Sequence, residues 1–217
     1  DYLLHYLEEK GYHYTVENSE YYGYPNEEEK YVTPESIATF VRSLQLPFRI
    51  RDYQLRGLYL AIKCNRKLLL SPTGSGKSLI IYALVRWHLQ HEREILIIVP
   101  TVSLVEQLYK DFIEYGWYVG HFVHKIMGGE EKYVKNPVVI STWQSIYKEP
   151  RKFFERFDVI IGDEAHQYKA KSLTGILTKC FDAKYRVGLT GTLDGMESHQ
   201  LVLEGLFGRV DRVTQTV

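Results

Sequence analysis

A glycine-containing stretch between an apolar run and a long helical pattern constrains the fold more than any other feature. Residues 67–71 have the pattern of a buried strand, residues 72–78 read PTGSGKS, and residues 77–91 have helical periodicity. Glycines at 74 and 76 let successive backbone N–H groups point at phosphate oxygens, at the positive end of the helix dipole. This order predicts a phosphate-binding loop; the alternative is an ordinary glycine-rich turn before a helix.

Each residue type in this loop has an expected role. Lys77 would reach the β and γ phosphates of a nucleotide, and the Ser78 hydroxyl would bind Mg²⁺. The position that usually holds the motif's first glycine is Ser71 here, so a strict pattern would miss the loop. The expected nucleotide-binding residues of the loop are Thr73, Gly74, Ser75, Gly76, Lys77 and Ser78.

Short apolar runs alternate with amphipathic helical patterns along most of the chain. Strands are expected at 67–71, 94–100, 122–127, 138–141, 158–162 and 186–190. Helices are expected at 33–44, 77–91, 102–115 and 172–180. Several strand candidates are apolar on both faces, which a parallel sheet covered on both sides requires. The predicted fold class is therefore α/β, with a doubly wound, mostly parallel sheet.

The formal net charge of zero is a cancellation between two parts of the chain. Residues 1–36 contain nine acids and two bases, whereas residues 37–217 contain 25 bases and 18 acids. This asymmetry suggests two modules, with a polyanion as a candidate partner of the basic one. We expect residues 1–32 to be the tail of an N-terminal accessory unit, with a helix at 1–10, a strand at 12–16 and an acidic linker. Residues 33–217 would form the α/β domain.

Composition excludes several classes of protein. The 45 % hydrophobic content excludes disorder, and no apolar run is long enough to cross a bilayer. The chain lacks the basic start of a secretory signal. Two cysteines, Cys64 and Cys180, cannot build a disulfide framework or a zinc cluster. We therefore expect a protein of the reducing cytoplasm that does not enter a membrane.

Two adjacent acids follow the apolar run at 157–162, about 85 residues after Lys77. In a parallel sheet, this places Asp163 and Glu164 at the carboxyl edge where ligands bind. Asp163 would hold Mg²⁺ through water, and Glu164 would polarise the water that attacks the γ phosphate. The alternative is an acidic surface turn.

With TGSGKS and the box DEAH both present, the chain resembles the first RecA-like motor domain of superfamily 2 helicases and translocases. Segments 51–54, 100–107, 128–129, 141–145 and 190–192 are similar, in order, to further motifs of that family, so the resemblance covers residues 49–192. It implies ATP and Mg²⁺ as cofactors and sequence-independent contacts to the DNA backbone. Gln54 would bind the adenine, with support from Arg51.

The resemblance assigns three further sets of residues. The implied catalytic set is Lys77, Asp163, Glu164 and His166. The implied nucleic-acid set is Pro100, Thr101, Gln107, Gly128, Gly129, Thr142 and Gln144. The set that would couple the nucleotide to the nucleic acid is Thr190, Gly191 and Thr192. Taken singly, many of these residues also fit helix caps and turns.

The function implied is ATP hydrolysis coupled to DNA translocation, as in helicases that unwind branched DNA in recombination and fork rescue. Two alternatives stay open: the motor of a restriction or remodelling translocase, and a P-loop ATPase that never acts on nucleic acid. The chain has no initiator Met and stops soon after residue 192. We therefore expect a fragment whose second RecA-like domain is absent, and which by itself hydrolyses almost no ATP.

Overall fold

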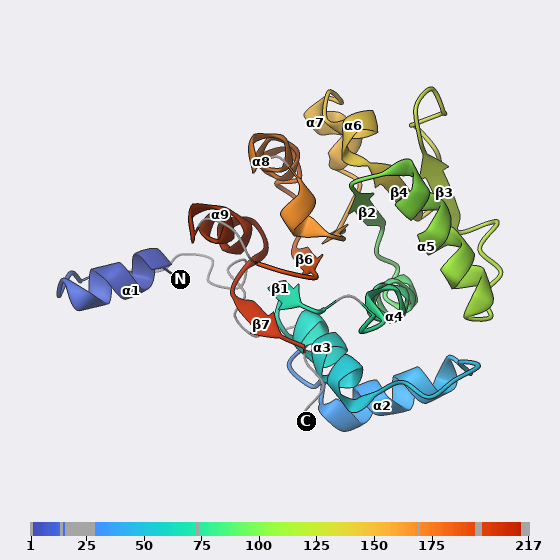
Figure 1. Ribbon diagram of the computed structural model, residues 1–217, viewed down its shortest axis with the longest axis horizontal. Coiled ribbons are helices and arrows are strands. Elements are labelled where there is room, and N and C mark those ends of the chain that lie inside the picture. The colour runs from blue at the N-terminus through green and yellow to red at the C-terminus, as the bar shows by residue number, and fades with distance from the viewer. Residues whose placement is uncertain are drawn as a thin grey trace.

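The computed structural model describes residues 2–13, 15, 29–72, 74–168, 170–193 and 197–213. One parallel sheet of seven strands lies at the centre, in the order β3-β4-β2-β5-β6-β1-β7 (Figure 1). The strands are β1 Arg66–Leu70, β2 Ile95–Val99, β3 Val123–Ile126, β4 Val138–Thr142, β5 Val159–Gly162, β6 Tyr185–Thr190 and β7 Val210–Arg212. The predicted α/β class and parallel sheet are confirmed.

Helices cover both faces of this sheet. On one face lie α2 Pro34–Ser43, α3 Asp52–Lys63, α4 Lys77–Gln90 and α5 Val102–Glu114. On the other lie α6 Trp143–Ile146, α7 Arg151–Phe154, α8 Ala170–Lys179 and α9 Glu197–Phe207. A helix α1, Tyr2–Glu9, lies apart from the sheet (Figure 1), and a short 3₁₀ helix, Ala165–Gln167, follows β5.

Strand β2 shows why the sequence needs cover on both faces. All five of its residues are buried. Ile95 and Ile97 join the core under α2–α5, whereas Leu96 belongs to the core under α6–α9. Side chains alternate across a strand, so a continuous apolar run fills two cores at once.

The strand β7 and the helix α9 before it were not predicted. β7 pairs in parallel with β1, with Leu69 opposite Asp211. Phe207 at the end of α9 lies against the sheet so closely that a Cβ at Gly162 or Gly188 would come within 2.7–2.8 Å of its ring. Glycine at these two positions is therefore required by the aromatic ring that seals the second core.

The N-terminal segment differs in part from expectation. The helix ends near Gly11, at φ +69°, as expected. Of the strand expected at 12–16, Tyr14 and Val16 lie outside the described residues, and the remaining positions form no strand. Glu29, expected in the acidic linker, is buried instead. The boundary at residue 33 stays a prediction, although Glu29, four residues before it, already packs against the sheet domain.

Glu29 takes part in a compact set of contacts. Its carboxylate pairs with Arg93 at 2.9 Å and lies 3.3 Å from the Tyr185 hydroxyl. The Lys63 ammonium donates to the backbone carbonyls of residues 29, 30 and 32. These bonds satisfy the polar groups of a segment that would otherwise cost free energy to bury. Within the described residues, no helix is long and apolar enough to span a bilayer.

Candidate nucleotide site and nucleic-acid edge

The predicted site residues come together because they follow adjacent strands. β6 lies between β1 and β5, so the loops after these three strands meet at one edge of the sheet. The phosphate-binding loop follows β1, Asp163 and Glu164 follow β5, and residues 190–192 end β6. This carboxyl edge is where ligands bind in open α/β sheets.

Two glycines give the phosphate-binding loop its shape. Gly74 and Gly76 have φ of +80° and +78°, which glycine adopts without strain. The Ser71 hydroxyl bonds the Ser75 hydroxyl at 2.6 Å, which gives the serine at the usual glycine position a structural role. Thr73 lies outside the described residues.

Lys77 at the start of α4 contacts the acid that was expected to polarise water. Its ammonium lies 2.9 Å from Glu164 Oε1, with both side chains largely buried, and 3.3 Å from the carbonyl of Ser71. The contact joins the loop after β1 to the turn after β5 across the intervening strand. A phosphate entering the loop would compete for Lys77 and release the Glu164 carboxylate.

The backbone separates the two adjacent acids. Glu164 adopts a left-handed conformation, φ 48° and ψ 47°, so the two side chains point in different directions. Asp163 is buried, and its carboxylate accepts a hydrogen bond from the Glu164 N–H at 2.9 Å. Burial, with the negative charge of Glu164 second, raises the pKa of Asp163 to about 6. A cation beside it would reverse this shift, and the Asp163 carboxylate with the Ser78 hydroxyl offers the oxygen ligands that Mg²⁺ prefers.

The Ser78 hydroxyl has a partner that was not predicted. It lies 2.7 Å from the Tyr115 hydroxyl, at the C-terminal end of α5. The metal-ligand role of Ser78 stays a prediction, and no motif pointed to Tyr115.

Tyr168 was also missed by the sequence analysis. Its hydroxyl lies 2.5 Å from the carbonyl oxygen of Ile98 and 2.7 Å from that of Asp163, which ties the acidic turn to β2.

The predicted coupling residues form a connected set with Glu164. His166 Nδ1 lies 2.7 Å from the Thr190 hydroxyl and 3.4 Å from Glu164 Oε2. The Gly191 N–H donates to the same Glu164 oxygen at 3.4 Å, and the Thr190 hydroxyl donates to the Thr192 carbonyl at 2.8 Å. Partial burial lowers the pKa of His166, which favours the neutral ring.

Gln54 braces the phosphate-binding loop. Its amide donates to the Ser75 carbonyl at 2.8 Å and accepts from the Arg51 N–H at 2.9 Å. The Arg51 guanidinium contacts the Tyr53 hydroxyl. The Gln54 amide already has partners within the protein, and its expected contact with adenine stays a prediction.

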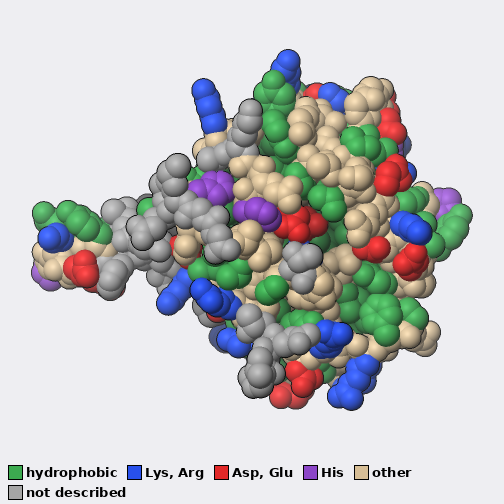
Figure 2. All heavy atoms as spheres, viewed as in Figure 1, with side chains coloured by type: hydrophobic (Ala, Val, Ile, Leu, Met, Phe, Trp, Pro, Cys, Tyr) green, Lys and Arg blue, Asp and Glu red, His purple; other side chains and the backbone are tan. Residues whose placement is uncertain are grey.

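The predicted nucleic-acid residues differ in exposure, and all of them except Gln107, which lies within α5, end or follow the strands β2, β3 and β4. Thr101 is exposed and caps α5, accepting from the Leu104 N–H at 3.3 Å, and the Gln144 amide donates to the Pro100 carbonyl at 3.4 Å. Thr142 is buried, with its hydroxyl 2.8 Å from that of Ser145, so that side chain serves as an internal contact. Exposed positions complete the set: Gln107, Gly128 and Gly129. On the described part of the face in Figure 2, basic side chains are interspersed with acidic ones.

Residues 47–195 match the family model of the type III restriction enzyme, res subunit, ResIII. The chain belongs to the ResIII family. It is 34 % identical over 169 residues to the ATP-dependent DNA helicase uvsW of Enterobacteria phage T4, covering 76 % of this chain and 34 % of that protein. It is 31 % identical over 143 residues to the DNA 3'-5' translocase XPB2 of Sulfurisphaera tokodaii, covering 66 % of this chain and 30 % of that protein. The chain thus spans about a third of the length of these curated ResIII relatives.

Solved structures agree with this membership. The crystal structure of the UvsW helicase from bacteriophage T4 superposes with a TM-score of 0.84 at 29 % identity, covering 97 % of this chain and 76 % of that one. The Pyrococcus furiosus Hef helicase domain superposes with a TM-score of 0.63, covering 75 % of this chain and 38 % of that one. Because its sequence identity is only 20 %, it supports the fold alone. The resemblance to helicase motor domains, and to UvsW in particular, is confirmed for this ResIII chain.

Proposed function

We propose that this chain is the first motor domain of an ATP-dependent DNA helicase or translocase. The observation that carries the proposal is the contact of Lys77 with Glu164, which itself contacts Gly191 and His166. One carboxylate thus touches both the phosphate-binding loop and the coupling segment. The curated relatives, of which the chain spans about a third, support a longer protein in which a second RecA-like domain completes the site.

The chemistry follows from the positions of these groups. Backbone N–H groups of the loop and Lys77 would bind the phosphates of ATP. Mg²⁺, held by Asp163 and the Ser78 hydroxyl, would neutralise phosphate charge. Glu164, released from Lys77, would orient the attacking water. The contact between His166 and Thr190 would then transmit the presence or loss of the γ phosphate to the rest of the segment at 190–192.

DNA would be bound through its backbone. Thr101 follows β2 and Gly129 follows β3, the two strands on either side of β4, and backbone N–H and hydroxyl groups at this carboxyl edge suit phosphate oxygens. Such contacts carry no base sequence, so binding should weaken steeply with salt. Unwinding of branched DNA, with roles in recombination and fork rescue, is the activity we propose for the whole protein. We place it in the cytoplasm, that of the host cell if a phage encodes it.

The test removes each partner of the ion pair in the full-length protein. Lys77→Ala removes a cation that would bind the phosphates, and Glu164→Gln removes the carboxylate that would orient the attacking water. Each is expected to lower DNA-stimulated ATP hydrolysis by about 10²-fold or more. Lys110→Ala and Glu114→Gln are matched controls, because they break an exposed Lys–Glu pair on α5. Activity within a few-fold of wild type for either site variant would reject the site.

The family description favours one second candidate, the motor subunit of a restriction enzyme. Both candidates hydrolyse ATP and contact DNA, so the ATPase test does not separate them. Strand-displacement assays on branched DNA distinguish the two candidates, because a helicase separates the strands. An ATPase that ignores nucleic acid would show no stimulation by DNA.

A further inference from the structure

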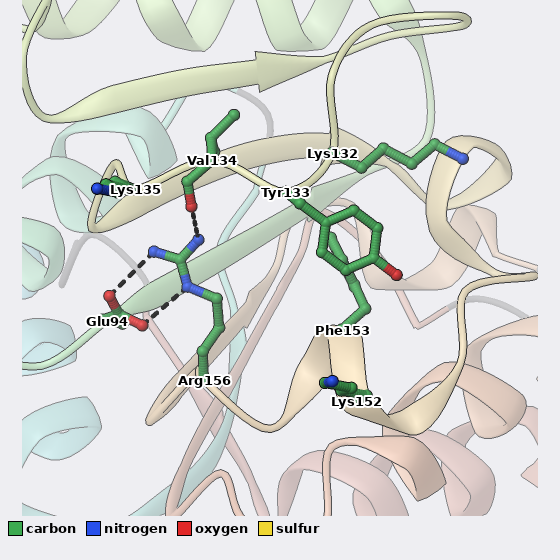
Figure 3. A pocket seen from close by; sticks show the side chains of 8 residues that line it. All are labelled: Glu94, Lys132, Tyr133, Val134, Lys135, Lys152, Phe153 and Arg156. Carbon is green, nitrogen blue, oxygen red and sulfur yellow. Dashed lines mark hydrogen bonds and ion pairs between the residues drawn. The ribbon is translucent and has the colours of Figure 1, made fainter.

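A pocket of about 370 Å³ lies away from the nucleotide edge, at the amino ends of β2 and β5 (Figure 3). Glu94 directly precedes β2, and Arg156 lies three residues before β5. The loop between β3 and β4 forms one wall, and α7 forms the other. Five strand residues at about 3.3 Å each separate this end of the sheet from the carboxyl edge by roughly 15 Å.

The acids around this pocket have ion-pair or hydrogen-bond partners within the protein. Glu94 forms a two-pronged ion pair with Arg156 at 2.8 and 2.9 Å, drawn in Figure 3. Glu149 pairs with Lys132 at 2.7 Å. Glu131 accepts hydrogen bonds from the backbone N–H groups of residues 132 and 133. Asp158, at the start of β5, accepts from the Glu94 N–H at 2.9 Å.

Two lysines at the pocket are left without such partners. Lys135 and Lys152 line the pocket from opposite walls, and both are exposed. In the described part of the chain, neither makes a hydrogen bond or an ion pair. Because Glu94 and Glu149 already pair with Arg156 and Lys132, the Lys135 and Lys152 ammonium groups remain for an external anion.

An aromatic surface accompanies these charges. Tyr133 is 62 % exposed, and its ring lies 5.8 Å from that of the buried Phe153, in an edge-to-face arrangement. Figure 3 shows the Tyr133 ring between the loop and α7. Basic side chains beside an exposed aromatic ring are the combination that proteins use for nucleic-acid strands, where phosphates meet the cations and a base or sugar meets the ring.

We propose that this pocket binds the phosphodiester backbone of a second segment of nucleic acid, distinct from the segment at the carboxyl edge. Lys135 and Lys152 would contact phosphates, and Tyr133 would contact a base or sugar. The inference rests on the proposed function, because it needs a protein that already binds DNA. It adds a contact on the opposite end of the sheet, which a single strand following the carboxyl edge does not reach.

Salt-dependent binding tests the proposal in the full-length protein. The double variant Lys135→Gln/Lys152→Gln is compared with Lys110→Gln/Arg209→Gln, which removes two exposed charges elsewhere. The probes are a fluorescein-labelled single strand, a duplex and a forked DNA. Loss of two phosphate contacts should reduce the slope of log K against log salt by about 1.4 to 1.8, so that binding at 0.1 M salt weakens roughly 25- to 60-fold relative to binding at 1 M. DNA-free ATP binding should be unchanged.

A proximity measurement adds a second readout. Both cysteines of the chain are buried, so Lys152→Cys introduces an accessible thiol for a photoreactive azidophenacyl label. Illumination should cross-link the forked DNA at position 152 but not at Lys110→Cys. If the wild type binds DNA but both double variants behave alike and no cross-link forms, only the pocket assignment is overturned. If the wild type neither binds DNA nor is stimulated by it, the proposed function fails, and this inference with it.

Discussion

At the scale of single residues, the burial of Asp163 affects both the stability of the fold and the binding of a metal ion. The carboxyl is buried at the end of β5, and burial raises its pKa to about 6. A raised carboxyl pKa means that the folded protein binds the proton more tightly than the unfolded chain does. Its contribution to stability is therefore present below pH 4 and is lost as the pH rises through about 6. Mg²⁺ would remove this penalty by pairing with the ionised form.

Replacement of this carboxyl should reveal the cost of ionising it. In metal-free protein, Asp163→Asn is expected to raise the free energy of unfolding at pH 7.5 relative to wild type by about 3 kcal/mol, because the pKa is raised by roughly two units. The difference should shrink towards zero near pH 4. Urea unfolding at both pH values measures it. An equal difference at the two pH values would contradict the burial argument.

At the scale of elements, the segment before α2 is part of the sheet domain's packing. Glu29 contacts Arg93, which lies between α4 and β2, and Tyr185 at the start of β6. Lys63, the last residue of α3, donates a hydrogen bond to the backbone carbonyl of Glu29 in the same segment. Three elements from distant parts of the chain thus hold one short piece of backbone.

This set of contacts should contribute measurably to stability. Glu29→Gln removes the carboxylate that pairs with Arg93 at 2.9 Å, and we expect a loss of about 2–3 kcal/mol in the free energy of unfolding, because one side of a buried ion pair is lost. Glu35→Gln, at an exposed position in the first turn of α2, is the matched control and should change it by less than about 0.5 kcal/mol. Equal effects in thermal or urea unfolding would show that Glu29 is an ordinary surface acid.

At the scale of the whole molecule, the nucleotide site faces the carboxyl edge of the sheet, while the second proposed DNA contact lies at the amino end. The site contains one lysine and two acids but, among the described residues, no arginine within contact of Glu164 or Lys77. Superfamily 2 motors are expected to receive arginine fingers from a second RecA-like domain. Such groups contribute on the order of 10³ to 10⁵ in rate.

Residues 1–217 by themselves are therefore expected to bind ATP and DNA weakly and to hydrolyse ATP at least about 10³-fold more slowly than a protein with both motor domains. Steady-state ATPase assays with and without DNA measure this difference. Lys77→Ala in the same isolated chain sets the background. Robust DNA-stimulated turnover by residues 1–217 would contradict the requirement for a second domain.

Local patterns determined most of the α/β layers and the core of the nucleotide site. The glycines at 74 and 76 dictate the loop's backbone, and runs such as 95–99 require cover on both faces, because conformation and side-chain alternation depend on neighbouring residues alone. Lys77 could be predicted because it begins the helix after the glycine-containing loop, and Glu164 because it closely follows a buried strand; Thr190 was assigned by the family resemblance.

Only the tertiary structure decided the features that join distant positions. The burial of Glu29, the pairing of Tyr115 with Ser78 and the parallel addition of β7 to β1 carry no local signal. The pocket at Lys135 and Lys152 exists because acids and bases far apart in the chain pair around it. The same side chain can be a solvated charge or a buried partner, and only the packing around it determines which.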